Sequence, residues 1–349
     1  MWKYVLKRIG LAFVTAFIIL SLTFILIQLL PFTKPASFTK GEQRAYYDKQ
    51  VSLGYVVRFD EKQTDEGPML FSIETELDGK KVTFFYYEVK PLKQYVRWLG
   101  NIVTKWDWGS SVKISPNLSA STIIAQRIPT SMKLNIISTL IAVPIGILLG
   151  IVAALKKNKP TDNIISTGVM VLISVPSFVL ITFLILFLGY KTGWLPTEWA
   201  KPTDSAQQKF LAYIIPITAL SLGSIAGYCR FTRAELCEVM SSEYLLLART
   251  KGLTKRQAIL RHALRNAMVP IVPSILAEFL SIMGGSMILE NLYGIPGIGT
   301  LFVDALNGKD YNVLFVDMAI FTTFGLLAGV LLDISYGFID PRIRMGAKK

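Results

Sequence analysis

The residues that could carry chemistry in this chain are a few ionisable side chains inside long apolar stretches. Glu278 lies well inside the stretch 268–289, and Asp317 and Asp333 lie within 313–338. A charged group inside a membrane is costly, so such residues usually face a wet cavity or pair with another polar group. Glu278 either lines a transport path or is hydrogen-bonded within a helix bundle, and we expect Asp333 to pair with a cytoplasmic base.

Serine residues near these stretches are further candidates for lining a path. Two of them belong to "SVPSF" (174–178), and a third follows Glu278. Small and polar residues at such places more often serve helix packing or a kink than contact with a ligand, so packing is the alternative interpretation. The candidate translocation path consists of Ser174, Ser177, Glu278 and Ser281.

The sequence predicts no enzymatic centre. His262 is the only histidine, which leaves no zinc-ligand cluster and no Ser-His-Asp set. The phosphate-binding pattern G-x-x-x-x-G-K-[ST] does not occur in the sequence. We expect Cys229 and Cys237 to be inert thiols. The chain is therefore predicted to be non-catalytic, with no metal and no cofactor.

A strongly basic segment, "EYLLLARTKGLTKRQAILRHALRNAMVP" (243–270), separates two apolar stretches. Good helix formers precede Gly252, a residue typical of helix C-termini, and Thr254 can cap a second helix. The apolar face of that helix would consist of Ile259, Leu260, Ala263, Leu264 and Ala267. Topology needs only a few basic residues and no ordered apolar face. We therefore predict a knuckle of two short helices that exposes Tyr244, Leu245 and Leu247 for docking into a groove of another protein.

Membrane-spanning helices must position these residues. Of the 349 residues, 52% are hydrophobic and only 17% are charged, against about 25% charged in a soluble domain. Apolar runs of the length that crosses a bilayer occur near 9–30, 134–155, 164–189, 210–228, 268–289 and 313–338. We predict an all-α polytopic membrane protein with six transmembrane helices, the first of them too long for a cleaved signal peptide.

The distribution of Lys and Arg predicts the orientation. These residues gather in the N-terminal segment, in 156–159, in 230–265 and in the C-terminal tail, and the short loops between the other spans hold few. Cytoplasmic loops are enriched in Lys and Arg, so both termini are expected in the cytoplasm. The net charge of +13 then reflects topology and attraction to anionic lipid, with no nucleic acid as partner.

A polar segment at 32–90 separates the first transmembrane helix (1–31) from a membrane core at 91–349 with five more spans. "FSIETELDGKKVTFFYYEV" (71–89) alternates apolar and polar residues around Asp78-Gly79, which suits a tight hairpin turn. We predict a small extracytoplasmic β-containing insertion, with Phe84 and Tyr86 as a contact face if its own core does not use them. Aromatic and basic residues at 91–108 indicate an interfacial helix.

Several segments together resemble one family. "ARTKGLTKRQAILRHALRNAMVP" resembles the signature cytoplasmic loop of ABC-importer permeases, in the form found in dipeptide and oligopeptide permeases. Four further segments resemble the same family and occur in the same order. They are "WDWGSSV" (106–112), "IAQRIPTSMKL" (124–134), "ENLYGIPGIGTLF" (290–302) and "IDPRIR" (339–344). The nearest type is the B-type membrane subunit of a peptide importer. The resemblance implies the type I importer permease fold and half of a translocation pore in a bacterial cytoplasmic membrane.

The resemblance also implies partners and a coupling site. The partners would be a second homologous permease subunit, two ABC ATPase subunits that hydrolyse ATP, an extracytoplasmic substrate-binding protein and membrane lipid. The coupling loop would span about 230–267, with docking residues Tyr244, Leu247, Ala248, Lys251, Gly252, Leu253, Arg261 and His262. The family's Glu-Ala-Ala motif falls here on Leu246, Leu247 and Ala248, so only Ala248 and Gly252 match and no role for a motif glutamate carries over.

"GIPGIGT" (294–300) is too rich in glycine and proline for an ordinary lipid-facing helix. Irregular backbone at membrane depth must be buried in protein or line a cavity. We therefore expect this loop to dip back at the outer mouth of the pore. The candidate outer gate consists of Gly294, Pro296, Gly297 and Gly299.

Two other classes of protein remain as alternatives. An ion-coupled secondary transporter acting alone could use Glu278 as its proton carrier, but the paired broken helices of an internal repeat are not evident. A membrane anchor without transport would leave the basic knuckle unexplained. Within the ABC importers, sister systems for nickel or glutathione share nearly the same scaffold, so the substrate stays open.

Overall fold

The computed structural model describes residues 2–28, 39–53, 56–62, 67–77, 80–281 and 286–339. The chain divides into two compact units. Unit 1 comprises Met1–Ala12, Ile128–Thr300 and Phe324–Lys349, and unit 2 comprises Phe13–Arg127 and Leu301–Thr323. The expected turn at Asp78-Gly79 and the segment 340–344 lie outside the described residues.

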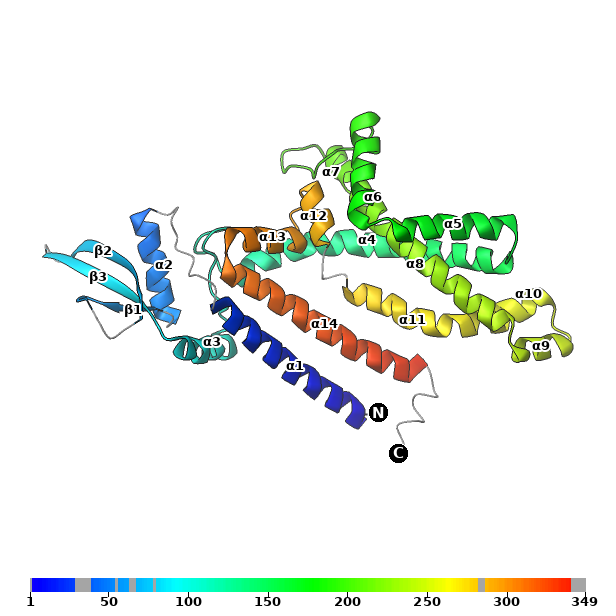
Figure 1. The fold of residues 1–349 in the computed structure, drawn as a ribbon, viewed down its shortest axis with the longest axis horizontal. Coiled ribbons are helices and arrows are strands. Elements are labelled where there is room, and N and C mark those ends of the chain that lie inside the picture. Colours follow the sequence, from blue (N-terminus) through cyan, green and yellow to red (C-terminus); the bar gives the residue numbers. More distant parts are fainter. Residues whose placement is uncertain are drawn as a thin grey trace. The chain divides into compact units, whose positions relative to one another are not determined.

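Long apolar helices dominate the described chain (Figure 1). They are α1 (Trp2–Gln28), α4 (Ala120–Leu155), α8 (Ile214–Met240), α11 (Leu264–Ser281) and α14 (Tyr311–Ile339). By length and composition, 5 helical stretches among the described residues could cross a membrane, and a bent helix pair raises this to 6 if it counts as one span. This agrees with the predicted all-α fold of six transmembrane helices.

The bent pair replaces the continuous third span expected at 164–189. α5 (Pro160–Ser174) and α6 (Ser177–Leu184), which continues into the π-helical turn η1 (Ile185–Lys191), meet at 101°. Val175 is extended between them, with φ −85° and ψ 122°. Pro176 lacks an N–H and disfavours a helical residue before it, which favours a break in the helix at this point. Figure 1 shows α5 and α6 on either side of this break, both beside α8.

The limits of two other spans also differ from expectation. α11 ends at Ser281, and a separate helix α12 (Met287–Tyr293) follows, so 268–289 is not one helix. The fourth span is longer than 210–228, because α7 (Ala206–Ala212) and α8 together form an apolar stretch at Ala206–Met240. The polar C-terminal part of α8 hides this length in the sequence.

Close packing between α4 and α8 depends on two glycines. A Cβ at Gly146 would lie 2.7 Å from Tyr228 Cβ, and one at Gly150 would lie 2.6 Å from Thr232 Cβ. Small residues four apart let two helix backbones approach closely in a membrane. The pair of glycines therefore fixes α8, which leads into the basic knuckle, against α4.

Unit 2 contains a small antiparallel sheet beside α2 (Lys40–Leu53), as Figure 1 shows. Its described strands, β1 (Val56–Phe59), β2 (Met69–Leu77) and β3 (Lys80–Glu88), have the order β1-β3-β2. β2 and β3 pair in register from Ile73 opposite Phe84 to Leu77 opposite Lys80. The predicted β-containing insertion is thus confirmed.

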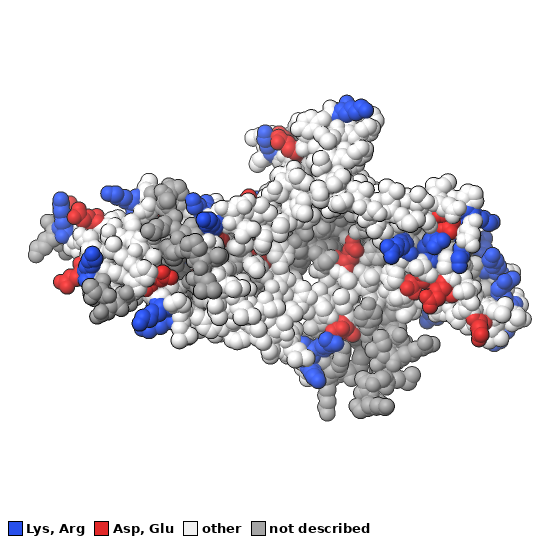
Figure 2. Space-filling view, viewed as in Figure 1, with Lys and Arg blue, Asp and Glu red and all other residues white. Residues whose placement is uncertain are grey.

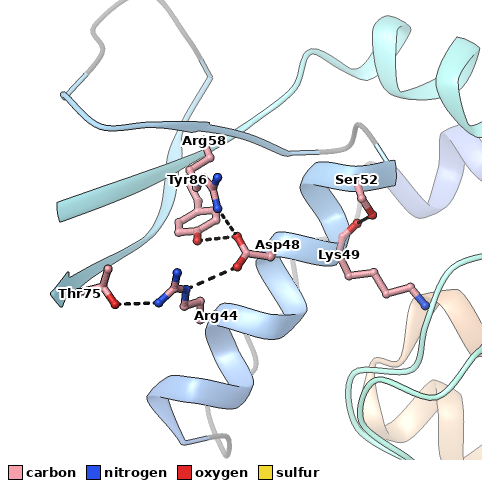
Figure 3. Close-up of polar contacts among 7 residues, drawn as sticks. All are labelled: Arg44, Asp48, Lys49, Ser52, Arg58, Thr75 and Tyr86. Atoms are coloured by element: carbon pink, nitrogen blue, oxygen red, sulfur yellow. Dashed lines mark hydrogen bonds and ion pairs between the residues drawn. The ribbon is translucent and has the colours of Figure 1, made fainter. Parts of the chain in front are cut away.

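The insertion uses its aromatic residues in its own core. Tyr47, Phe84 and Tyr86 are buried together in one cluster. Asp48 on α2 accepts a hydrogen bond from Tyr86 Oη at 2.9 Å and from Arg58 Nη1 at 2.8 Å (Figure 3). The condition for a contact face at Phe84 and Tyr86 is therefore not met, because both side chains belong to the core of the insertion.

The segment that leads into α4 is held by one carboxylate of unit 2. Asp310 lies between α13 (Ile298–Gly308) and α14, and its Oδ2 accepts the Ser111 hydroxyl at 2.5 Å. The same oxygen accepts backbone N–H groups of Val112, Lys113 and Ile114 at 3.1, 2.9 and 3.1 Å. Successive N–H groups of this kind form a cradle for an anion. The turn before α4 is thereby fixed to the start of α14.

Candidate functional site

The basic knuckle consists of two helices that meet at a glycine, as the sequence predicts. α9 (Glu243–Thr250) ends before Gly252, whose φ of +94° favours glycine. α10 (Lys255–Ala258) begins with a capping box in which Thr254 Oγ1 accepts the Gln257 N–H and the Gln257 side chain accepts the Thr254 N–H. The chain then continues through the π-helical turn η2 (Ile259–Ala263) into α11 without a break.

Apolar side chains fasten the knuckle to the long helices of unit 1. Leu245, Ile259 and Ala263 are buried against Leu236 of α8 and Ala154 of α4. Leu245 was expected on the surface and is 5% exposed, and Leu260 was expected on the buried face and is 56% exposed. Leu260 lies in the π-helical turn, which changes the phase of the helix, so a regular period of 3.6 residues does not hold there. Leu245 lies in α9, where it packs against the long helices.

Most of the predicted docking residues form the free surface of the knuckle. Tyr244, Leu247, Lys251, Gly252, Arg261 and His262 are exposed, and Ala248 and Leu253 are half-buried. In Figure 2, Lys and Arg side chains gather on unit 1 where Figure 1 labels α9 and α10. The knuckle therefore offers exposed apolar side chains within a cationic surround, on a base that is well packed.

A buried ion pair that the sequence analysis missed fixes α5 to α8. Asp162 is 1% exposed, and its two carboxylate oxygens accept Arg233 Nε at 2.6 Å and Nη2 at 2.7 Å. The backbone N–H of Asn158 donates to the same carboxylate at 2.9 Å. Two parallel hydrogen bonds of this type fix direction as well as distance. The only signal in the sequence was an acidic residue beside the cluster of lysines at 156–159.

Glu278 is hydrogen-bonded within the helix bundle and also borders a pocket. Ser224 Oγ of α8 donates to Glu278 Oε1 at 2.5 Å. The two residues line an open pocket of about 360 Å³, together with Gly223, Gly227, Tyr228, Phe231 and Ser274. The hydrogen bond within the helix bundle is therefore present, and the same side chain also borders a pocket.

A second pocket of about 630 Å³ lies at the bend between α5 and α6. It is lined by Ser177 and shares Gly223, Gly227 and Phe231 with the first pocket. Ser177 and Glu278 therefore lie in pockets that border one edge of α8. Ser174 is exposed and donates its hydroxyl to Met170 O in its own helix, and the side chain of Ser281 lies outside the described residues.

Glu290, which is not among the candidate residues predicted from the sequence, organises the glycine-rich loop at 294–300. The side chain is 2% exposed, and it comes from α12. Its carboxylate accepts the Ser131 hydroxyl at 2.7 Å and the backbone N–H groups of Ser286, Gly299 and Thr300 at 3.3, 2.8 and 3.4 Å. Burial raises the pKa of Glu290, while these hydrogen bonds act in the opposite direction. An acidic residue just before a glycine-rich loop was the available signal.

The candidate gate glycines are explained by this carboxylate and by the local backbone. Gly294 has φ +69° and ends α12 in the left-handed conformation. A Cβ at Gly297 would collide with the Glu290 carboxylate and the Ser131 hydroxyl, and a Cβ at Gly299 would lie 2.6 Å from Met287 Cα. Gly294 and Pro296 also line a pocket of about 620 Å³ with Trp199 and Tyr213, among others.

These features define the class of the protein. A membrane-embedded transporter subunit needs helices that span a bilayer, and the chain has apolar helices of that length. It also has pockets along α8 and an exposed basic knuckle on a packed base. Residues 146–345 match the family described as binding-protein-dependent transport system inner membrane component. The chain belongs to this family and is a multi-pass inner-membrane protein.

Comparison with known proteins supports the assignment over the whole chain. It is 33% identical to the dipeptide transport system permease protein DppB of Lactococcus lactis over 99% of this chain and 100% of that protein. It is 32% identical to the oligopeptide transport system permease protein OppB of Haemophilus influenzae with the same coverage. A chain of the inward-facing MetNI methionine ABC transporter matches with a TM-score of 0.51 and 15% identity, over 63% of this chain and 97% of that one, which shows the fold.

Proposed function

We propose that the chain is the permease subunit of an ATP-driven peptide importer and forms half of its translocation pore. The knuckle is the observation that carries this proposal, because an exposed docking surface on a rigid base has no use in a carrier that acts alone. Names of full-length relatives support dipeptides or oligopeptides as substrates. The separate functional parts would be 1–31, the outer domain at 32–90 and the core at 91–349.

Two ABC ATPase subunits would supply the energy, one of them docking on this knuckle. The exposed Tyr244 and Leu247 would enter a groove of the ATPase, in the helix-in-groove mode. Lys251, Arg261 and His262 would lie at the edge of that contact. The knuckle and both termini would then lie in the cytoplasm, which the distribution of basic residues supports.

A second homologous permease subunit would complete the pore. We place the translocation path along the edge of α8 that borders both pockets, with Ser177 and Glu278 in its wall. Closure of the ATPase dimer would move the knuckle as a rigid body, tilt α8 and α11, and switch the cavity from inward-facing to outward-facing. An extracytoplasmic binding protein would deliver peptide to the outer mouth, which the loop at 294–300 closes.

Site-directed cysteines test the docking and the orientation together. Cys229 and Cys237 are replaced by alanine, and single cysteines are placed at Leu247 and at Glu198, which are both exposed. We expect cysteine at Leu247 to cross-link to a co-expressed ATPase subunit and to resist a membrane-impermeant maleimide in whole cells. Cysteine at Glu198 should react with the reagent and form no such cross-link. The opposite pattern would overturn both the docking site and the orientation.

Reconstitution tests the class of transporter and its substrate. The purified permease pair with its ATPases and binding protein should take up labelled dipeptide or oligopeptide into vesicles only with ATP. Nickel and glutathione in place of peptide test the sister systems. Uptake by this chain alone, driven by a proton gradient and lost in Glu278→Gln, would replace the proposal with a secondary transporter.

A further inference from the structure

The helix α3 (Pro91–Lys105) in unit 2 has three distinct faces. Gln94, Trp98 and Asn101 form a buried face. Leu92, Val96 and Val103 are 77%, 63% and 76% exposed, and they lie at the helical spacing that forms one apolar stripe. Lys93, Arg97, Gly100 and Thr104, all exposed, form a third flank that is polar and cationic.

The buried face fastens α3 to the ends of two membrane-spanning helices. The Trp98 ring lies 4.6 Å from the ring of Phe24 on α1 and 5.2 Å from that of Phe315 on α14. Ser21 Oγ and Tyr95 Oη are hydrogen-bonded at 2.7 Å. Phe24 and Phe315 each lie about one turn, roughly 5 Å, from the end of their helix. That depth is where amphipathic helices lie at the boundary between headgroups and acyl chains.

The part of α1 that packs against α3 also carries exposed apolar side chains. Leu22, Ile25 and Leu26 in the same part of α1 are exposed by half or more. Trp106, which follows α3, is 70% exposed. Tryptophan is enriched at membrane interfaces, where its apolar ring and its N–H are both accommodated.

A basic pocket opens on the polar side of the same helix. It has a volume of about 690 Å³, and α3 contributes Arg97, Gly100, Thr104 and Lys105 to its lining. Arg58 of β1 also lines the pocket, with its Nη1 paired to Asp48 at 2.8 Å, and no acidic side chain is among the described lining residues. A Cβ at Gly100 would meet no atom within 4 Å, so the pocket stays open beside the helix.

We infer that α3 and this pocket bind an anionic phospholipid, whose phosphate lies between Arg97 and Lys105 and whose acyl chains lie along Leu92, Val96 and Val103. The apolar stripe beside the cations favours a lipid over a free anion, because inorganic phosphate would leave the stripe uncovered. It also favours a lipid over a soluble protein, because the helix is held at membrane depth by Trp98. The inference is independent of the transported substrate.

Native mass spectrometry of the full-length chain in detergent tests the headgroup contact. Phosphatidylglycerol should bind more tightly than phosphatidylcholine, and Arg97→Gln with Lys105→Gln should weaken phosphatidylglycerol binding about thirtyfold, since each of the two basic groups near a surface contributes about 1 kcal/mol. Lys201→Gln with Lys209→Gln removes the same charge from another loop and should have no effect. Arg97→Lys with Lys105→Arg should retain binding. Equal loss in the control pair, or competition by free glycerol phosphate as strong as by lipid, would overturn the site.

A nitroxide label tests where the stripe lies. In vesicles containing phosphatidylglycerol, a label at Val96 should be accessible to oxygen and protected from a water-soluble nickel chelate, and a label at Thr104 should show the reverse preference. A label at Val96 that the chelate reaches would contradict the lipid contact. Protection from both reagents that appears only when the binding protein or a second permease is added would assign the face to a protein partner and overturn the inference.

Discussion

Ser131 and Glu290, 159 residues apart in the sequence, are joined by a buried hydrogen bond of 2.7 Å. The same serine oxygen accepts the backbone N–H of Ile298 at 2.9 Å. One hydroxyl therefore connects α4, the carboxylate of α12 and the first residue of α13. The proposed outer gate is not a loose loop but a set of N–H groups gathered around one carboxylate.

Replacing Glu290 by alanine should destabilise this loop. The change leaves buried N–H groups of Gly299 and Thr300 without their acceptor, at a cost of about 1–3 kcal/mol for each unsatisfied group. We expect a lower melting temperature of the purified protein and leakage or loss of coupled uptake. Glu198→Ala is the control, since its pair with Lys201 is largely exposed. Normal stability and coupling in Glu290→Ala would show that the carboxylate does not hold the loop.

The same carboxylate predicts a dependence of stability on pH. Burial raises the pKa of Glu290, so the folded loop binds a proton more tightly than the unfolded chain does. The resulting stabilisation is fully present below the ordinary pKa and is lost as pH rises through the raised value. Unfolding of wild type and Glu290→Gln, measured between about pH 4.5 and about pH 7.5, should show a steeper loss with rising pH in wild type. Parallel curves would mean that Glu290 has no shifted pKa.

Gly252 provides a test of the knuckle that separates strain from docking. Gly252→Val places a β-branched residue at φ +94°, although no atom lies within 4 Å of the added Cβ. We expect about 1–2 kcal/mol of backbone strain and loss of ATP-driven uptake. Gly193→Val is the matched control, because Gly193 also has a positive φ (+66°) and open space around it.

The control distinguishes the two explanations for any loss of transport. Gly193→Val should cost similar stability while it leaves assembly with the ATPase unchanged. Gly252→Asn should restore most uptake, since asparagine tolerates the left-handed region better than valine. Equal loss of uptake in both valine variants would mean that general instability, and not the knuckle, is responsible.

The ion pair of Asp162 and Arg233 should contribute more to the free energy of unfolding than a surface ion pair does. Asp162→Ala leaves a partly buried guanidinium without its partner, and we expect a loss of about 3 kcal/mol, at the lower end for buried pairs because Arg233 is 32% exposed. Glu198→Ala breaks a pair whose side chains are 71% and 69% exposed and should cost less than about 1 kcal/mol. A double-mutant cycle by thermal unfolding measures the difference, and equal couplings for both pairs would contradict it.

Removal of the outer domain tests its contribution to import. Deleting residues 40–90 with a short Gly/Ser bridge should raise the substrate concentration needed for uptake, if the domain takes part in docking of the binding protein. Basal ATPase activity should be retained, because the knuckle lies in a different part of the chain. Transport with unchanged concentration dependence would show that the domain is a passive insertion.

The sequence predicted the elements better than their breaks. Apolar runs revealed the spans, and Gly252 with Thr254 revealed the knuckle, because these signals are local. The 101° bend at Val175-Pro176 was missed, since a proline inside an apolar run is equally consistent with a mild kink. The exposure of Leu260 accompanies a π-helical turn at Ile259–Ala263 that a fixed period of 3.6 residues cannot anticipate, and Leu245 of α9 is buried by its contacts with the long helices.

The residues that organise the outer loop depend on contacts over long sequence separations. Glu290 and Ser131 became significant only when the fold brought α4 to α12, and the same holds for Asp310 and the backbone at 111–114. Glu278 was selected because an acid within an apolar run is conspicuous without any structure. An acid in a polar or mixed segment gives no such signal.

The continuous helical stretch Lys255–Leu280 connects the knuckle to Glu278, so a rotation of the knuckle is transmitted to that side chain. Its rise of about 1.5 Å per residue places Glu278 roughly 35 Å from Lys255. A rod of that length, turned by about 5° relative to α8 at its knuckle end, would displace the far carboxylate by about 3 Å, the length of one hydrogen bond. A small rotation at the surface is therefore enough to break or make the contact between Glu278 and Ser224.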